Sequence, residues 1–115
     1  MAKHSILGMS QVASLWRDVY NETKVGSSID PVIIRCGQPD EIVENENCVH
    51  RLLTYGVVLP ENEGINLTGC TRYSWISDEW KGWMRGGWIK REMHFFVRDK
   101  TIIYFVGKNL DYHGW

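Results

Sequence analysis

Apolar residues recur at three- and four-residue steps near the beginning of the chain. The positions that share one helical face at this spacing are Val12, Leu15, Trp16, Val19 and Tyr20. Ser10 stands just before them and is a residue type that caps the first turn of a helix. The pattern predicts an amphipathic helix that starts at Ser10 and packs its apolar face against the rest of the protein.

A second, shorter helix is predicted within "KVGSSIDPVIIRCGQPDEIV". Ser28 can cap it, and Asp30 and Pro31 are favourable residues in its first turn. Gly37 can adopt the left-handed conformation that ends a helix, and Pro39 cannot continue one. The chain should therefore leave this helix in extended form.

The pattern then changes to that of strands. Residues 48–59, "CVHRLLTYGVVL", are rich in β-branched and aromatic side chains and predict a strand, which "PENEGINLTG" follows with the composition of a loop. "TRYSWI" predicts another strand. The clearest element is "WIKREMHFFVRDKTIIYFVG", which predicts a hairpin with its turn at Asp99 and Lys100.

A two-residue turn fixes the register of this hairpin. The pairs expected on the face that covers the helices are Val97 with Ile102, Phe95 with Tyr104, and Met93 with Val106. The opposite face is expected to carry Trp88, Lys90, Glu92, His94, Phe96 and Arg98, facing Ile103 and Phe105. This second face mixes charged and apolar residues, unlike a sheet face that is simply exposed to water. We expect it to be covered by the Trp-rich connection before the hairpin, by "NLDYHGW", or by a second copy of the protein.

These elements predict a single α+β domain over residues 1–115, with two N-terminal helices packed on an antiparallel sheet of about four strands. Apolar residues make up 43% of the chain and charged residues 23%, which is typical of a globular protein and excludes wholesale disorder.

Charge and cysteine content narrow the function classes. The formal net charge of −1 argues against nucleic acid as the partner, because nucleic-acid-binding proteins carry an excess of Lys and Arg. The sequence shows no apolar run of the length of a membrane span, and its three cysteines have no disulfide spacing. We expect a cytoplasmic protein with reduced thiols and no membrane contact.

The stretch "GSSIDPVIIRCGQPDEIV" resembles the small helix-helix-sheet module of the barrel-assembly lipoproteins of the outer membrane and of the β-lactamase inhibitory protein. That module has a Gly followed by a hydroxyl residue, a short helix, Gly-x-Pro, and a strand that ends in Tyr-Gly. The residues at the corresponding places here are Gly26, Ser27, Gly37, Pro39 and the pair Tyr55 and Gly56. The resemblance implies the same fold and a bacterial binding or inhibitory module, and it transfers no catalytic residue. The lipobox and export signal of the lipoproteins do not occur in this sequence.

Several groups are candidates for acid-base or metal chemistry. They are His4, His50, His94 and His113, and the acidic residues Asp40, Glu41, Glu44 and Glu46. Cys48 and His50 would share a strand face, which is half of a zinc site, but no second pair with ligand spacing follows. The acidic segment is typical of a solvated turn, although two carboxylates in a dry pocket could act as acid and base. We predict no metal, no cofactor and no catalytic residue.

The stretch "SDEWKGWMRGGWIKR" combines three tryptophans with four cationic residues and two carboxylates. These rings could form a satellite core over the second sheet face, stack on a small flat molecule, or anchor a protein partner, with nucleic acid the least favoured partner. We assign Trp75 and Trp88 to packing, because they lie in or beside strands. Trp80 and Trp83 lie in the predicted connection, and we assign them to recognition.

The sequence therefore predicts a non-enzymatic binding or interaction module whose partner is a protein or a second copy of the chain in a homodimer. The residues expected to make the contact are Trp80, Trp83, Arg85, Trp88, Lys90, His94, Phe96 and Phe105. The alternative is a small enzyme or ligand carrier with a Trp-lined pocket, in which His94, Asp40 or Glu41 would be the acid-base group. A deep cavity that holds one of those groups would favour the alternative, and a flat apolar patch would favour recognition.

Overall fold

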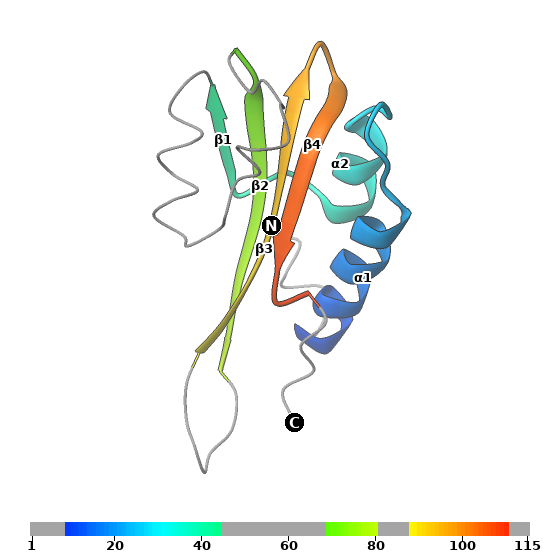
Figure 1. Cartoon of the computed structure of the whole chain (residues 1–115). Helices are drawn as coiled ribbons and strands as arrows, with labels where there is room; N and C mark the ends of the chain where they lie inside the picture. The colour runs from blue at the N-terminus through cyan, green and yellow to red at the C-terminus, as the bar shows by residue number, and fades with distance from the viewer. Residues whose placement is uncertain (1–8, 45–68, 81–87, 111–115) are drawn as a thin grey trace.

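The computed structural model describes residues 9–44, 69–80 and 88–110 of the chain. Two helices come first, α1 at Met9–Glu22 and α2 at Asp30–Cys36. The strands are β1 at Glu41–Glu44, β2 at Thr71–Trp80, β3 at Trp88–Arg98 and β4 at Thr101–Lys108. They form one antiparallel sheet in the order β1-β2-β3-β4 (Figure 1). The predicted α+β class, with two helices ahead of a four-stranded antiparallel sheet, is confirmed.

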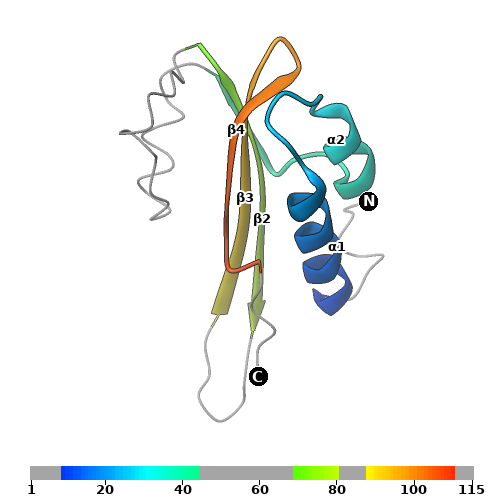
Figure 2. The same ribbon diagram turned by 45° about the vertical axis from the view of Figure 1, so that its right-hand side comes forward.

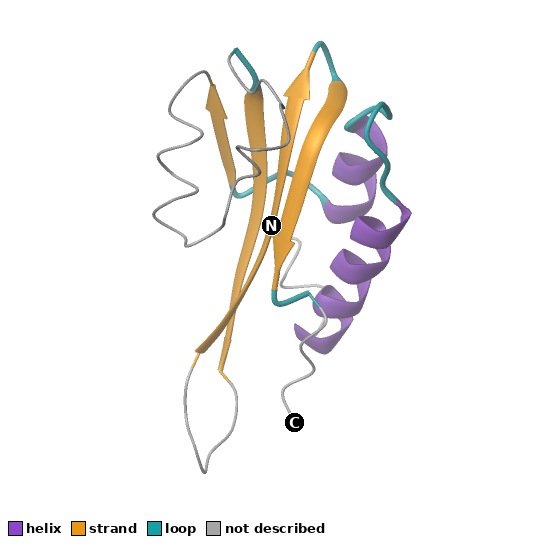
Figure 3. Cartoon of the chain, in the orientation of Figure 1, coloured by secondary structure: helices purple, strands orange, loops and turns teal. Residues whose placement is uncertain are grey.

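Both helices cover the same face of the sheet (Figures 2 and 3). The apolar side chains buried between helices and sheet include Val12, Trp16, Val19, Val32, Trp75, Met93, Phe95 and Ile102. Removal of this apolar surface from water is the main stabilising term of such a layered fold. Trp75 is fully buried, and its indole Nε1 donates to the carbonyl of Gly37 at 3.1 Å. The assignment of Trp75 to packing is confirmed.

The helix boundaries differ in part from the prediction. Ser10 lies inside α1 and is not its cap. Ile29 is the N-cap of α2, and Ser28 accepts a hydrogen bond at Oγ from the backbone N–H of Asp30 at 3.1 Å. Gly37 ends α2 with φ 81° and ψ −170°, and its N–H donates to the carbonyl of Ile33 at 2.8 Å. This φ is positive as predicted, but the extended ψ directs the chain straight toward the sheet.

The chain forms a strand soon after α2, in a segment where we expected a turn. β1 begins at Glu41, within the acidic stretch that the composition assigned to a solvated turn. The side chain of Asp40 accepts a hydrogen bond at Oδ2 from the backbone N–H of Ile76 at 2.7 Å, which ties the start of β1 to β2. The strand predicted at residues 48–59 and most of the loop after it lie outside the described residues.

The β3–β4 hairpin turns at the predicted residues. Asp99 and Lys100 have φ values of 53° and 64°, as a two-residue turn of type I′ requires. Val97 pairs with Ile102 as expected. A β-bulge follows, so that Phe96 pairs with Tyr104 and Phe95 with Phe105, and Ile103 is the additional residue of β4.

The bulge reverses the predicted faces of two aromatic residues. Phe105 points to the helices, where its ring centroid lies 5.1 Å from that of Tyr20 and 5.7 Å from that of Phe95. Tyr104 lies on the opposite face, 5.9 Å from the ring of Phe96. The prediction that Phe105 occupies the face away from the helices was therefore wrong, because a strict two-residue period was extended past an inserted residue.

The connection between the helices is fixed to the free edge of β4. Gly26 donates to the carbonyl of Ile102 at 2.8 Å, and the N–H of Ile102 donates to the carbonyl of Ser27 at 2.8 Å. Ile29 donates in turn to the carbonyl of Lys100 at 3.0 Å. These bonds satisfy backbone groups of β4 beside the hairpin turn and place α2 against the sheet.

Candidate functional site

The sheet face opposite the helices, here called the outer face, carries its side chains in cross-strand rows. The register gives the rows Val43, Arg72, Phe96, Tyr104; then Glu41, Ser74, His94, Val106; and then Ile76, Glu92, Lys108. In the row nearest the hairpin turn, Val43, Phe96 and Tyr104 belong to a small second apolar cluster that also contains buried Cys70. The middle of the face is polar and yet fully buried, with Arg72, Ser74, Glu92 and His94 each at 0% exposure.

These buried polar groups form one connected network across three strands. Ser74 Oγ lies 2.7 Å from His94 Nδ1, and His94 Nε2 lies 3.1 Å from Glu92 Oε1. Arg72 donates from Nη1 to Ser74 Oγ and lies 3.2 Å from His94 Nδ1. From Nη2 it donates to Glu41 Oε1 at 2.7 Å. The network thus runs from β1 through β2 to β3.

Its donors and acceptors assign the histidine tautomer. A guanidinium group only donates, so His94 Nδ1 must accept from Arg72 or Ser74. The ring proton is then on Nε2, from which it is donated to the carboxylate of Glu92. In this arrangement the guanidinium of Arg72 and the hydroxyl of Ser74 both approach the one lone pair of Nδ1.

Two buried atoms of the network have no hydrogen-bond partner. They are Nε of Arg72 and Oε2 of Glu92. A buried charged group with an unpaired atom is costly, and buried ion pairs seldom add net stability because desolvation offsets their attraction. The network is therefore not expected to add much to the stability of the fold. For this reason we consider it a candidate functional site.

A second feature is a two-stranded ribbon at the far end of the sheet. β1 pairs with β2 only at residues 71–74, and the pairing of β3 with β4 ends at Glu92 and Lys108. Residues 78–80 and 88–90, here called the β2–β3 arm, pair with each other beyond that point (Figure 1). Trp80 lies directly opposite Trp88 in this register. Asn109 donates from Nδ2 to the carbonyl of Lys90 at 2.8 Å and joins the base of the arm to the segment after β4.

The structure changes the interpretation of several predicted site residues. Trp80 belongs to β2 and not to the connection, and it is the register partner of Trp88, so its predicted place in the connection was wrong. The assignment of Trp80 to recognition and of Trp88 to packing stays a prediction. Lys90 is exposed, whereas Arg91, counted among the cations of the Trp-rich stretch, is 1% exposed. Trp83 and Arg85 lie outside the described residues.

The remaining predicted residues lie on the sheet. His94 and Phe96 are on the outer face as expected, but both are fully buried. Phe105 faces the helices. Glu41 joins the polar network through Arg72, whereas the Oδ2 of Asp40 binds a backbone N–H. The sequence analysis missed Arg72 and Ser74, although their alternation with Tyr73 and Trp75 in "TRYSWI" was a signal that they share the face of His94.

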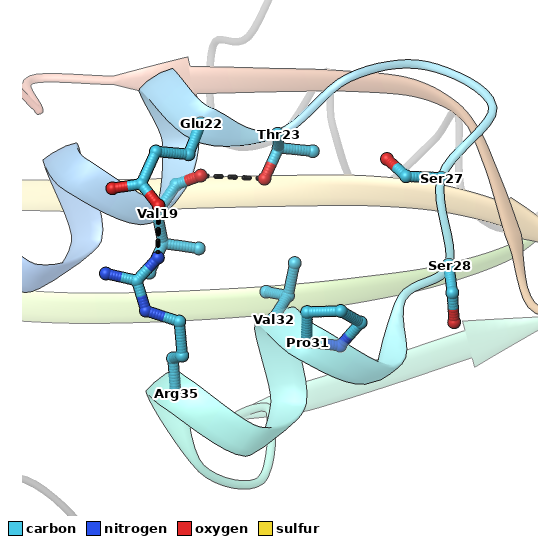
Figure 4. Close-up of a pocket in the computed structure, with 8 residues that line it drawn as sticks. All are labelled: Val19, Glu22, Thr23, Ser27, Ser28, Pro31, Val32 and Arg35. Atoms are coloured by element: carbon cyan, nitrogen blue, oxygen red, sulfur yellow. Dashed lines mark hydrogen bonds and ion pairs between the residues drawn. The ribbon is translucent and has the colours of Figure 1, made fainter.

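A small pocket lies on the helix side, between the end of α1 and the start of α2 (Figure 4). Its volume is about 180 Å³, and its lining residues are Val19, Glu22, Thr23, Ser27, Ser28, Pro31, Val32 and Arg35. The ion pair between Arg35 Nη1 and Glu22 Oε1, at 2.7 Å, borders it on one side. Ligand pockets usually measure about 300–1,000 Å³, so this one has room only for a very small molecule.

The two described cysteines, Cys36 and Cys70, are buried and form no disulfide. Cys48 and His50, the candidate half of a zinc site, lie outside the described residues. Burial raises the pKa of the Cys70 thiol, and the nearby Arg98, whose Nη2 lies 3.5 Å from Sγ, partly opposes this. Within residues 9–44, 69–80 and 88–110 no three His, Cys, Asp or Glu side chains are grouped so as to hold a metal ion.

Comparisons with protein-family models, with curated proteins and with solved structures give no match to this chain. Among the described residues, neither helix has the length and apolar character needed to cross a membrane.

Proposed function

We propose that this protein is a non-enzymatic recognition module that binds a protein partner through the end of the β2–β3 arm and the connection of residues 81–87. The observation that carries the proposal is the pairing of Trp80 with Trp88 at the end of a ribbon that continues beyond the other two strands. A two-stranded ribbon has little stability of its own, so tryptophan at its end points to a role outside the fold. Tryptophan is also among the residues that most often dominate the energy of protein interfaces.

Charge and packing support this choice of partner. Lys90 on the arm is exposed, and in the sequence Arg85 stands between Trp83 and Trp88. Arginine and tryptophan are both enriched at protein interfaces. Among the side chains that the structure describes, the tryptophans of the main core are Trp16 and Trp75. A binding role also agrees with what the sequence resemblance implies, and the proposal retains the cytoplasmic location expected from the sequence.

The partner is a different protein or a second copy of the chain. The position of Phe105 against the helices removes it from any dimer surface on the outer face. Half-buried Ile103, Tyr104 and Val106 remain there. The alternative of a ligand carrier with a Trp-lined pocket gains no support from the pocket beside α2, which is small and lined by aliphatic, hydroxyl and paired charged groups.

Affinity capture from extracts of the native cells, followed by calorimetry with the purified partner, tests the proposal. The variant carries Trp80→Ala and Trp83→Ala, and the control is Ile34→Ala, which removes an apolar side chain that is 80% exposed on α2. We expect the control to bind like wild type and the double variant to lose at least about tenfold in affinity. Equal affinity of a folded double variant would refute the proposal. Sedimentation distinguishes the partners, since a second copy gives a wild-type dimer and a monomeric double variant.

A further inference from the structure

The two edges of the β2–β3 arm differ in what they offer a partner. On the β4 side, the carbonyl of Lys90 already accepts a hydrogen bond from Asn109 Nδ2 at 2.8 Å. On the β1 side, the described pairing of β2 stops at Ser74, although the strand itself continues to Trp80 (Figure 1). Within the described part of the chain, the β2 side of the arm is therefore the longer open edge.

Hydrogen bonds made by Asp40 show which backbone groups of β2 face this edge. Its N–H donates to the carbonyl of Ser74 at 2.8 Å, and its Oδ2 accepts from the N–H of Ile76 at 2.7 Å. Because backbone groups alternate in direction along a strand, those of Asp78 face the same way, whereas those of Ser77 face β3. The carbonyl of Ile76 and both backbone groups of Asp78 thus point outward, beyond the place where Asp40 ends the pairing of β1.

Outward backbone groups on a strand edge are a template for a further strand. We propose that a partner protein contributes an extended segment that pairs antiparallel with residues 76–80 of β2 and carries a basic residue opposite Asp78. This inference rests on the proposed function and adds the mode of binding and the chemistry of the partner. The antiparallel direction follows that of every described strand pair in the sheet.

The side chains along this edge select the segment that fits. Asp78 is exposed and Ile76 is half-buried, and both lie on the outer face. The strands β1 and β2 contain a single basic residue, Arg72, which is buried, whereas the carboxylates of Asp40, Glu44 and Asp78 are exposed. Opposite charges and aromatic–β-branched pairs stabilise antiparallel strands when they lie directly opposite each other. The edge therefore favours a segment with Lys or Arg opposite Asp78 and an aromatic residue opposite Ile76.

A second copy of the chain fits this edge less well than a different protein. In the register that joins residues 76–80 of one copy to residues 76–80 of another, Asp78 lies on the two-fold axis. The two Asp78 side chains would then be directly opposite each other, and like charges in that position destabilise a strand pair. The occupant is therefore a basic segment of another protein.

Binding of the synthetic peptide acetyl-Thr-Tyr-Thr-Lys-Thr-Tyr-Thr-amide to the full 115-residue chain tests the proposal. In an extended conformation this peptide presents its lysine and both tyrosines on one face. One control peptide has glutamate in place of lysine. The other carries N-methyl groups on the lysine and both tyrosines, which removes the donors that would face β2. Amide hydrogen exchange followed by NMR is the measurement.

Addition of a strand predicts protection that alternates along β2. With the lysine peptide, the N–H of Asp78 should exchange at least about tenfold more slowly, whereas the N–H of Ser77, which faces β3, should be unchanged. The glutamate peptide should bind a few-fold more weakly, and the N-methylated peptide should give no protection. An Asp78 N–H that stays unprotected at millimolar concentration of the lysine peptide overturns the proposal.

Two substitutions at Asp78 separate the backbone from the charge. Asp78→Pro removes the outward N–H, and proline is tolerated where the N–H of an edge strand faces away from the sheet. It should weaken binding of the lysine peptide by at least about fivefold. Asp78→Asn keeps the N–H and should remove the preference for lysine over glutamate. Glu44→Gln is the matched control, because Glu44 is exposed on β1 opposite Thr71, and it should keep that preference. If Asp78→Pro does not fold, the N-methylated peptide makes the same test on wild type.

The strand addition and the proposed function can fail separately. A folded Asp78→Pro variant that binds the lysine peptide as tightly as wild type overturns strand addition and leaves recognition by the tryptophans standing. Unchanged partner affinity in the variant with Trp80→Ala and Trp83→Ala refutes the proposed function, whatever the peptide does. Protection of Asp78 by the lysine peptide, lost on N-methylation, supports strand addition.

Discussion

Gly107 of β4 lies against the ring of Tyr20 in α1. A Cβ built on Gly107 would stand 2.9 Å from Cε1 of Tyr20 and 2.5 Å from Cδ1 of Leu110. Such distances are shorter than carbon atoms tolerate, so this part of α1 approaches β4 closely only because residue 107 has no side chain.

Gly107→Ala should lower the free energy of unfolding by about 1–3 kcal/mol, because the Tyr20 ring and the Leu110 side chain must both move. Chemical denaturation measures the change. Gly26→Ala is the control: its φ is 98° but nothing lies within 4 Å of the added carbon. That control should cost about 1 kcal/mol through backbone strain alone. A Gly107→Ala variant as stable as wild type would contradict the contact.

The same glycine shows where prediction from the sequence stopped. Helical spacing, strand alternation and the Asp99–Lys100 turn were enough for both helices, the hairpin and its first pair. The bulge at Ile103 could not be predicted, because nothing in the alternation of the hydrophobic residues from 102 to 106 marks an inserted residue. In the expected register Val106 would face the helices. Only the packing of α1, which requires a residue without a side chain beside Tyr20, selects Gly107 for that place.

Gly37→Ala should also be destabilising, by about 1–3 kcal/mol. With φ 81° and ψ −170°, Gly37 lies in a region of backbone conformation that is essentially restricted to glycine. The same residue accepts the indole hydrogen bond of Trp75, so strain there also disturbs the core. Chemical denaturation is again the measurement. An unchanged midpoint would mean that α2 ends elsewhere.

Phe105→Glu should destabilise the fold and leave the association state unaffected while the chain is folded. The ring packs between Tyr20 and Phe95, and a carboxylate at that place loses the ring contacts and most of its hydration. We expect a loss of about 3 kcal/mol or more in unfolding free energy. Tyr104→Glu is the matched control on the outer face and should cost less. Denaturation and sedimentation of both variants decide the matter, and greater damage from Tyr104→Glu would reverse the assigned faces.

Less of the candidate site than of the fold could be predicted from the sequence. Alternation alone places His94 beside Phe96 and on the face away from the helices, which the structure confirms. Partner strands decide which residues meet across that face. Ser74 lies opposite His94 only because β2 pairs with β3 in one register, and the sequence does not contain that register. The contact of Arg72 with Glu41 requires β1. The acidic residues of that segment had led us to predict a solvated turn there.

Alkaline pH should weaken the fold through Tyr20. Burial raises the pKa of its phenol above 10.0, and a hydrogen bond with the backbone of Gly107 partly opposes the shift. Since the folded state holds this proton more tightly than the unfolded chain, the stabilising contribution is complete below pH 10 and is lost as the pH rises through the pKa of the folded state. Urea denaturation between pH 8 and about pH 11 should therefore show a steeper loss of stability for wild type than for Tyr20→Phe. Parallel pH profiles would exclude this role for Tyr20.

Replacement of tryptophan by alanine should affect stability differently at different places in the sheet. Trp75 is fully buried and packs edge-on against Phe95, with ring centroids 5.6 Å apart, so Trp75→Ala should cost about 3–5 kcal/mol. Trp80 and Trp88 are register partners at the end of the β2–β3 arm, beyond the rows that β1 and β4 complete. Because the two residues are register partners beyond the four-stranded part of the sheet, we expect Trp80→Ala and Trp88→Ala to shift the melting temperature equally and by only a few degrees. Differential scanning calorimetry of the three variants measures this. A large drop for Trp88→Ala alone would support the division made from the sequence and would show that the two strands are not equivalent at the end of the arm.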